Sequence, residues 1–191
     1  GWTGRLAQAL SGHMEVELRE QVLGDGCHVS RNPSVHLVVL RDLIWLKAAL
    51  AASGAPVPLA VQAAIDHMGP SLGFFRHGDG LLALFQGSAE EDRAIVTETL
   101  AAMPGKVRTR STAPQGNYER LHSGPSLVLL DAGAPPSDPY ASHAHAGTLA
   151  FKFSIGRERL VVNCGHRGAG NWYDASRATA AHSTLILADT N

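Results

Sequence analysis

The chain has 191 residues, 45% of them apolar, and a formal net charge of -1 at pH 7. This length and apolar fraction suffice for a folded protein with a sizeable hydrophobic core, and they exclude a disordered chain. The near-zero charge gives no reason to expect nucleic acid or an anionic membrane surface as a partner. No apolar run is long enough for a transmembrane segment, and no secretory signal is recognisable. Two cysteines, Cys27 and Cys164, do not make a disulfide framework.

The two ends predict that the chain is a segment of a longer protein. Residue 1 is glycine and leads straight into a helical pattern, whereas residues 189–191 follow directly on a strand-like run. On this interpretation, a missing targeting signal carries no information about the location of the parent protein. The sequence makes no prediction of the oligomeric state.

Residues 1–105 are expected to be α-helical, because apolar residues recur at helical spacing and Gly- or Pro-rich turns separate the segments. Asn32 is the expected N-cap of the second helix, with Pro33 at its first position. Antiparallel helices joined by short loops indicate stacked helical hairpins. The expected helices cover approximately residues 2–23, 33–52, 59–75 and 92–102.

Residues 106–191 are expected to be β-structure. Short apolar segments alternate there with Pro-, Gly- and Asp-rich loops, and Gly156-Arg157 fits a two-residue hairpin turn. Strands at this spacing predict an antiparallel sheet or sandwich, so the chain is predicted to be α+β with two domains. The expected strands are 118–121, 126–130, 148–155, 159–163 and 183–187.

Three histidines, His143, His145 and His182, lie within about forty residues on this predicted β scaffold. Imidazoles bind transition metals and move protons near neutral pH. A compact cluster of these side chains is therefore the best candidate for a functional site, either as a metal site, as proton-transfer groups, or as both.

The motifs around these histidines resemble those of the heparinase II/III family of polysaccharide lyases. His143-Ala-His145-Ala-Gly-Thr-Leu-Ala-Phe151 is similar to the family's His-x-His-x-Asp-x-x-x-Phe strand. Asn163-Cys-Gly165 is similar to its Asp-x-Gly hairpin end, and His182-Ser-Thr-Leu185 to its His-Asn-Thr-Leu. Upstream, residues 25–36 resemble the signature Asp-Gly-Gly-His-x-Glu-x-Ser-Pro-x-Tyr-His. The resemblance implies a fragment that joins the end of an (α/α) toroid, residues 1–105, to the beginning of a C-terminal β-sandwich, residues 106–191.

The activity that the resemblance implies is β-elimination in an acidic polysaccharide, beside a uronic acid. The reaction requires that the carboxylate be neutralised, that a base take the proton from the neighbouring carbon, and that an acid protonate the leaving oxygen. His143 matches the family's catalytic histidine, and His28 or His36 is expected to assist it from the helical side. A core or capping role for His36 is the alternative.

The same resemblance implies a zinc site in which His145 and His182 are ligands and Asn163 stands where the family has Asp. Neutral Asn is a weaker ligand than a carboxylate, although water could complete the shell. A tight turn at Gly156-Arg157 would also pair Asn163 with about Ala150 instead of His145. The predicted site therefore requires a β-bulge, or requires that His182 come from a neighbouring strand.

The chain departs from the family pattern at the catalytic tyrosine, which is Val35 here and cannot transfer a proton. Ser30 and Gly147 replace two acidic residues of the motifs. Other side chains of suitable type could take over the proton transfer, namely Tyr118, Tyr140, Tyr173 and His36. The alternative is a catalytically inactive glycan-binding or cell-envelope protein on the same scaffold. A metal-dependent hydrolase is a weaker hypothesis, because no carboxylate accompanies the histidines.

Residues expected to bind the polysaccharide come from both halves. Arg31 and Asn32 belong to the upstream motif, and His77 lies in a loop between helices, where a plain turn is the alternative. Trp172 could stack on a sugar ring or pack under a loop. The partner is thus expected to be an acidic polysaccharide, and the resemblance implies a periplasmic location.

Overall fold

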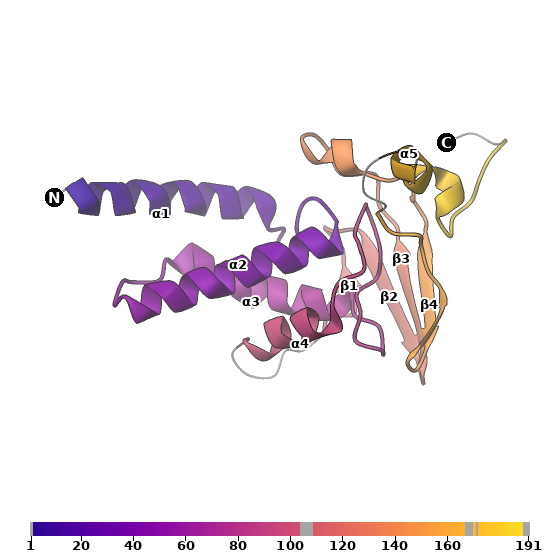
Figure 1. Cartoon of the computed structure of the whole chain (residues 1–191), viewed down its shortest axis with the longest axis horizontal. Coiled ribbons are helices and arrows are strands. Elements are labelled where there is room, and N and C mark those ends of the chain that lie inside the picture. The colour runs from indigo at the N-terminus through magenta and orange to yellow at the C-terminus, as the bar shows by residue number, and fades with distance from the viewer. Residues whose placement is uncertain (1, 104–108, 167–169, 171, 189–191) are drawn as a thin grey trace.

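The structure of the chain, a computed structural model, describes residues 2–103, 109–166, 170 and 172–188. Within these residues the first half holds four helices, α1 (Trp2–Gln21), α2 (Pro33–Ala52), α3 (Leu59–Phe74) and α4 (Arg93–Ala101). The second half contains five strands, β1 (Thr112–Ala113), β2 (Tyr118–Ser123), β3 (Ser126–Asp131), β4 (Phe151–Ile155) and β5 (Glu158–Val161). It also contains three short helices, η1 (Tyr140–His143), α5 (Trp172–Arg177) and η2 (Thr179–Ala181). The fold is therefore α+β, as predicted (Figure 1).

Local signals in the sequence account for the helix boundaries. The Asn32 side chain accepts hydrogen bonds from the backbone N–H groups of Ser34 and Val35, and Pro33 occupies the first turn of α2. This cap satisfies donors that have no partner inside the helix. At α4, Asp92 caps in the same way through the N–H of Ala94. The expected start of each of these helices is confirmed.

The five strands form one antiparallel sheet in the order β1-β2-β3-β4-β5. Each strand pairs with the next along the chain, so the sheet is a meander of hairpins. Ile155 pairs with Glu158 across the turn Gly156-Arg157, and Gly156 has a φ of 57°. A two-residue hairpin turn requires such a left-handed residue, so the predicted turn is confirmed. The β4–β5 register shifts between Phe153 and Ser154.

One feature of the predicted β half differs in the structure. Residues 183–187 were expected to be a strand but belong to none of the five. Ser183 makes two other hydrogen bonds instead. Its carbonyl oxygen accepts from Phe151 N at the start of β4, and its backbone N donates to the Asn163 amide oxygen. Of the two predicted arrangements, an antiparallel sheet or a sandwich, the described residues form a single antiparallel sheet.

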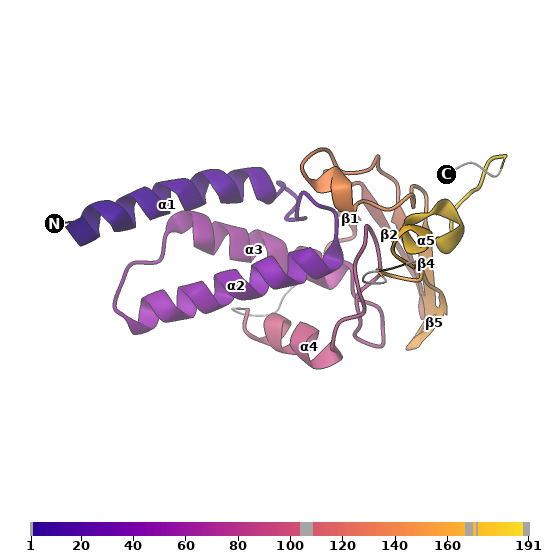
Figure 2. The same ribbon diagram turned by 45° about the horizontal axis from the view of Figure 1, so that its top comes forward.

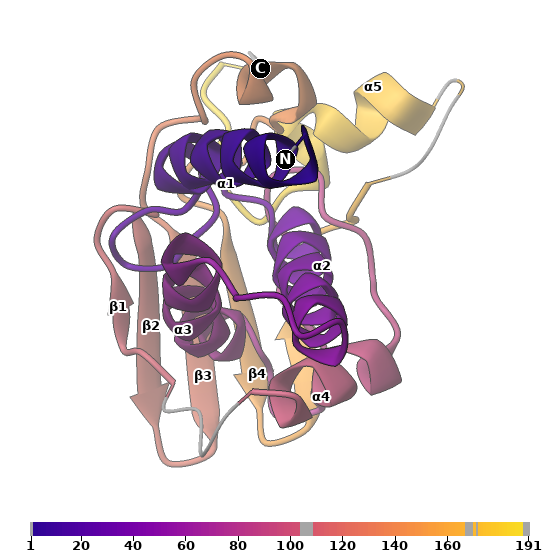
Figure 3. The same cartoon turned by 90° about the vertical axis from the view of Figure 1, so that its left-hand side faces the viewer.

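The helices direct their ends, and the loops between them, at one face of the sheet (Figures 1 and 2). Viewed from the helical side, the strands run behind α2, α3 and α4 (Figure 3). Tyr118 of β2 is fully buried at this junction, with ring centroids 5.0 Å from Phe75 and 4.9 Å from Phe85. Burial of one such aromatic ring contributes about 1.5–3 kcal/mol. One hydrophobic cluster therefore connects the helical half to the sheet.

The opposite face of the sheet exposes large apolar side chains, among them Leu121, Phe151, Ile155 and Leu160. Along β4 the exposed Phe151 and Ile155 alternate with buried residues, as a period of two requires. None of the described helices is long and apolar enough to cross a membrane.

Candidate functional site

A cavity of about 300 Å³ lies where the helical half meets the second half of the chain. We refer to it as the histidine cavity. The helical half contributes residues from the start of α2 and from the turn after the 81–85 segment, namely Ser30, Asn32, Val35, Gln86 and Gly87. The second half contributes aromatic rings and one cation, namely Tyr140, His143, His145, His166, Tyr173 and Arg177. Predicted residues far apart in sequence are thus brought together here.

His143 ends the short helix η1 and has an exposed side chain at the cavity. The backbone around it is held from two sides. Arg177 donates from Nε to the carbonyl of Ala144 over 3.2 Å, and His145 N donates to the Gln86 side-chain oxygen, also over 3.2 Å. The segment that carries His143 is therefore anchored to α5 and to the helical half at once.

Tyr173 and Arg177 form a pair one helical turn apart on α5. Arg177 donates from Nη1 to the Tyr173 hydroxyl oxygen over 3.2 Å, and its guanidinium lies 5.2 Å from the centre of that ring. The His166 ring meets the Tyr173 ring edge-on at 5.8 Å. The hydrogen bond from Arg177 therefore fixes the position of the Tyr173 hydroxyl at the cavity.

His145 and His182 approach each other directly, with 3.2 Å between Nδ1 of His145 and Nε2 of His182. Nδ1 of His182 lies 2.8 Å from the carbonyl oxygen of Ala178. A carbonyl only accepts, so this nitrogen carries the hydrogen and Nε2 presents its lone pair towards His145. Burial, with a contribution from neighbouring His182, lowers the pKa of His145 to about 4. Both rings are therefore neutral near pH 7, the form that binds metals.

The fit of this pair to zinc is partial. A tetrahedral zinc ion with nitrogen ligands at about 2.0–2.1 Å would hold them about 3.3–3.4 Å apart, close to the separation of the two imidazoles. Asn163 is less suitable, because its amide oxygen accepts from Ser183 N at 3.1 Å and from Ser183 Oγ at 3.2 Å. It would have to release these bonds to reach a metal. Among the described residues, no group of three His, Cys, Asp or Glu side chains could hold a metal ion.

The histidines predicted on the helical side occupy different places. His28 is buried beneath the cavity, 2.8 Å from Ser30 Oγ through Nδ1, and its ring meets the Tyr140 ring at 5.9 Å. His36 lies in the core, where Nε2 donates to the Met68 carbonyl over 3.0 Å. Burial lowers the pKa of both rings to about 4. Only His28 is thus connected to a residue that lines the cavity.

The four residues predicted to bind substrate are scattered. Arg31 is buried in an ion pair with Asp131. Asn32 lines the cavity, but its side-chain amide already caps α2 and donates to the Gln86 carbonyl. His77 is buried against Ser154 Oγ at 2.9 Å. Trp172, by contrast, is 73% exposed and does not line the cavity. The structure does not gather these four side chains into one binding surface.

Three cavity residues were not expected from the sequence to form the site, namely Gln86, His166 and Arg177. Each is a common residue type without a motif of its own. Among the three, only Arg177 had a signal in the sequence, since it stands five residues before His182, where the motif similar to His-Asn-Thr-Leu begins. Tyr140 and Tyr173 were candidates by residue type, and both line the cavity, whereas Tyr118 is buried with its hydroxyl donating to the Arg31 carbonyl.

This fold, with helix ends set against an antiparallel sheet, is that of solved polysaccharide lyases. The heparan sulfate lyase HepC from Pedobacter heparinus superposes with a TM-score of 0.73 at 16% sequence identity, covering 96% of this chain and 33% of the other. A heparinase III superposes with a TM-score of 0.71 at 14% identity, covering 95% and 35%. Identities this low show the shared fold.

Residues 105–191 match the family model described as heparinase II/III-like, C-terminal. The match covers less than half of the chain, and within it the resemblance seen in the motifs is confirmed. A curated relative, the FtsZ-localized protein C of Caulobacter vibrioides, is 35% identical over 173 residues, which are 91% of this chain and 30% of the relative. The chain spans about a third of the length of the relatives that it matches.

Proposed function

We propose that the protein binds an acidic polysaccharide in the histidine cavity and cleaves it by β-elimination beside a uronic acid. The observation that carries the proposal is the lining of the cavity, which combines one guanidinium, two phenols and two histidines besides His145. No carboxylate lines this cavity in the part of the chain that the structure describes. Such a lining favours an anionic ligand and supplies groups that transfer protons.

Each chemical requirement of the reaction has a candidate in the cavity. Arg177 is the cation that pairs with the uronate carboxylate. Tyr173, whose oxygen Arg177 holds, takes the proton from the carbon beside the carboxylate, and the electrons of that C–H bond form the new C=C bond. The C–O bond to the leaving sugar then breaks, and His143 donates a proton to the leaving oxygen. Val35, which stands where the family has its catalytic tyrosine, lines the same cavity. The Tyr140 and Tyr173 side chains therefore lie near that position.

We assign the remaining predicted residues supporting roles. His28 supports Tyr140 from below, through their edge-on ring contact. His36 has no place in this mechanism, because it is surrounded by core residues. His145 and His182 would hold a zinc ion, if one binds, as a structural group beside the cavity. A polysaccharide substrate of this kind would be met in the periplasm.

The experiment is an assay of the intact protein on uronate-containing polysaccharides, followed by the ultraviolet absorbance of the unsaturated uronate product. We expect product from the wild type, a loss of at least about a hundredfold in His143→Ala and in Tyr173→Phe, and no loss in His122→Ala, an exposed histidine on β2. A wild type that binds the polysaccharide without forming product would exclude the lyase function.

The second candidate is a non-catalytic glycan-binding or cell-envelope role on the same scaffold. Two observations favour it, namely Val35 in the tyrosine position and the relative named as an FtsZ-localized protein. In that case the same cavity binds polysaccharide, and Arg177→Ala weakens binding while no variant affects product, because none is formed.

A further inference from the structure

A second cavity, of about 320 Å³, lies between α2 and α4 in the helical half. We refer to it as the tryptophan cavity, because Trp45 of α2 lines it and is 60% exposed. Arg41 and Ile44 belong to the same wall, and Ile95 and Glu98 of α4 belong to the opposite one. An apolar lining with a few polar groups is typical of sites for small ligands and for single units of larger ones.

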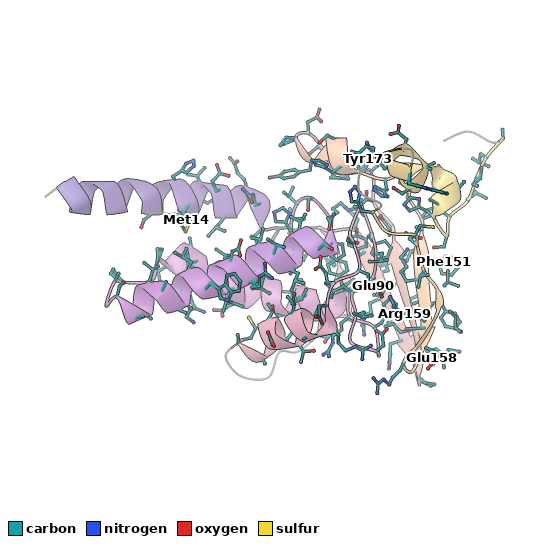
Figure 4. The ribbon with its side chains drawn as sticks, in the orientation of Figure 1. Met14, Glu90, Phe151, Glu158, Arg159 and Tyr173 are labelled. Carbon is teal, nitrogen blue, oxygen red and sulfur yellow. The ribbon has the colours of Figure 1, made fainter. Side chains whose placement is uncertain are left out.

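The tryptophan cavity is separate from the histidine cavity. Val35, in the first turn of α2, lines the histidine cavity, and Trp45 follows ten residues later on the same helix, about 15 Å along its axis. Figure 4 shows Tyr173 of the histidine cavity above the helices, whereas α4 lies below α2 (Figures 1 and 4). A ligand of the tryptophan cavity therefore does not need the groups to which we assign proton transfer.

The indole ring of Trp45 is held by Arg41, one helical turn earlier. The guanidinium carbon lies 4.7 Å from the centre of the indole ring. A cation–π contact at such an exposed site contributes about 0.5–1 kcal/mol and restrains both side chains. Most of the Trp45 side chain nevertheless remains accessible. A restrained, accessible aromatic ring is a platform on which the C–H face of a sugar ring stacks, because the contact removes apolar surface of both from water.

Two charged side chains of the lining have no partner. Arg41 and Glu98 do not pair with each other, and in the part of the chain that the structure describes neither side chain forms an ion pair or a hydrogen bond. The Nε atom of Arg41 is buried and among those without a partner. The third polar side chain of the lining, Thr99, already donates to the Ile95 carbonyl over 2.7 Å. One group of donors and one acceptor are therefore left for a ligand.

These unpaired groups indicate what kind of ligand fits. A guanidinium only donates hydrogen bonds and an ionised carboxylate only accepts them, whereas each hydroxyl of a sugar does both. A uronate or sulfate would be attracted by Arg41 but repelled by Glu98, so the lining does not favour an anion. An apolar helix of a partner protein would cover both charges without satisfying them, at a cost in free energy.

We infer that the tryptophan cavity binds a neutral sugar unit of a polysaccharide, stacked on Trp45, with hydroxyls that accept from Arg41 and donate to Glu98. This second site goes beyond the proposed function. It does not require cleavage in the histidine cavity, and it serves a lyase and a non-catalytic glycan-binding protein alike.

The test is calorimetric titration of the intact protein with two uncharged oligosaccharides of equal length, one of β-linked glucose and one of β-linked N-acetylglucosamine. We expect at least one of them to bind at millimolar concentration. Trp45→Ala should weaken that binding about tenfold or more, because the stacking platform is lost. Glu98→Gln should weaken it about two- to fivefold, because an amide is a poorer acceptor than a carboxylate. Thermal unfolding checks that both variants are folded.

The matched control is Trp172→Ala, which removes another exposed tryptophan, on α5, and should leave the affinity unchanged. The inference is overturned if neither oligosaccharide binds, or if Trp45→Ala and Glu98→Gln bind as tightly as the wild type. A loss in Trp172→Ala as large as in Trp45→Ala would also overturn it, because the sugar would then lie elsewhere. Neither oligosaccharide contains a uronate, so these results are independent of the test of lyase activity.

Discussion

Gln86 donates a hydrogen bond from its side-chain nitrogen to Oδ2 of Asp131, 2.7 Å away, at the end of β3. The same carboxylate pairs through Oδ1 with Arg31. Gln86 and Arg31 both have left-handed backbones, with φ of 47° and 57°, and so does Leu149, whose N donates to the Asp131 carbonyl. Such conformations cost about 1–3 kcal/mol each and persist only where surrounding contacts hold them. Asp131 is therefore the point that holds three strained segments around the histidine cavity.

Gln86→Ala should destabilise the fold by about 1–3 kcal/mol, because it leaves the buried Asp131 oxygen and the His145 N–H without this partner. It should also weaken polysaccharide binding, since the segment that carries His143 loses an anchor. Urea unfolding and calorimetric titration check the two effects. Gln62→Ala, which removes only an exposed bond to Asp66, is the control and should change neither quantity. Unchanged stability in Gln86→Ala would contradict the role of this amide.

Lys152→Met should stabilise the protein. Lys152 lies on the buried face of β4, its Nζ is 4.5 Å from the centre of the Phe85 ring, and no hydrogen-bond partner for Nζ is found in the described residues. Burial lowers the pKa of this amine to about 7. An apolar side chain of similar length removes the desolvation cost and keeps the packing, a gain of about 1–3 kcal/mol. A lower midpoint in thermal unfolding would show instead that the ammonium contributes to the fold.

The stability of the protein should fall between pH 7 and pH 5. Burial lowers the pKa of His36 to about 4, below its ordinary value of 6.5. As the pH falls, His36 therefore takes up a proton in the unfolded chain before it does so in the folded one. Its contribution to the free energy of unfolding is constant above about pH 6.5 and is lost as the pH falls towards 4. His36→Met should remove about 2 kcal/mol of the difference in unfolding free energy between pH 7 and pH 5. His122→Gln, at an exposed site, should leave the difference unchanged, and an unchanged difference in His36→Met would contradict the prediction.

Asn163→Asp should tighten zinc binding by about tenfold or more, because a carboxylate is a better zinc ligand than an amide. His145→Ala and His182→Ala should each abolish binding, since the two imidazoles are the nitrogen ligands of the proposed site. Metal analysis after dialysis and calorimetric titration with zinc measure both effects. Equal affinities of the wild type and Asn163→Asp would show that position 163 does not face the metal. Zinc retained in both histidine variants would place the site elsewhere.

Local features of the structure could be predicted from the sequence, because they depend on neighbouring residues. The Asn32 cap and the hairpin turn at Gly156 are examples, since each is completed within three residues. The strand expected at 183–187 failed for the opposite reason. Its apolar run is a local signal, but Ser183 bonds to the Asn163 side chain, 20 residues away, and to Phe151, 32 residues away.

The candidate site was predictable only in part. The motif residues His143, His145 and His182 were identified through the family resemblance, and the structure places His145 and His182 in contact. Arg31 and His77 were predicted to bind substrate, and the structure buries both in other contacts, with Asp131 and Ser154. Gln86 and Arg177 were missed, because their partners lie 45 and 33 residues away and no spacing rule links such pairs.

The α+β order of the chain, the caps and turns, and the family resemblance of residues 105–191 could be predicted from the sequence, because periodicity, short-range hydrogen bonds and motifs depend on neighbouring residues. Which titratable groups share a cavity and which are buried in the core depends on the tertiary structure. Tyr173 and Arg177 line the cavity, whereas Tyr118 is buried. The physical reason is that burial and charge depend on what packs against a side chain, and at this junction the packing comes from segments up to a hundred residues apart.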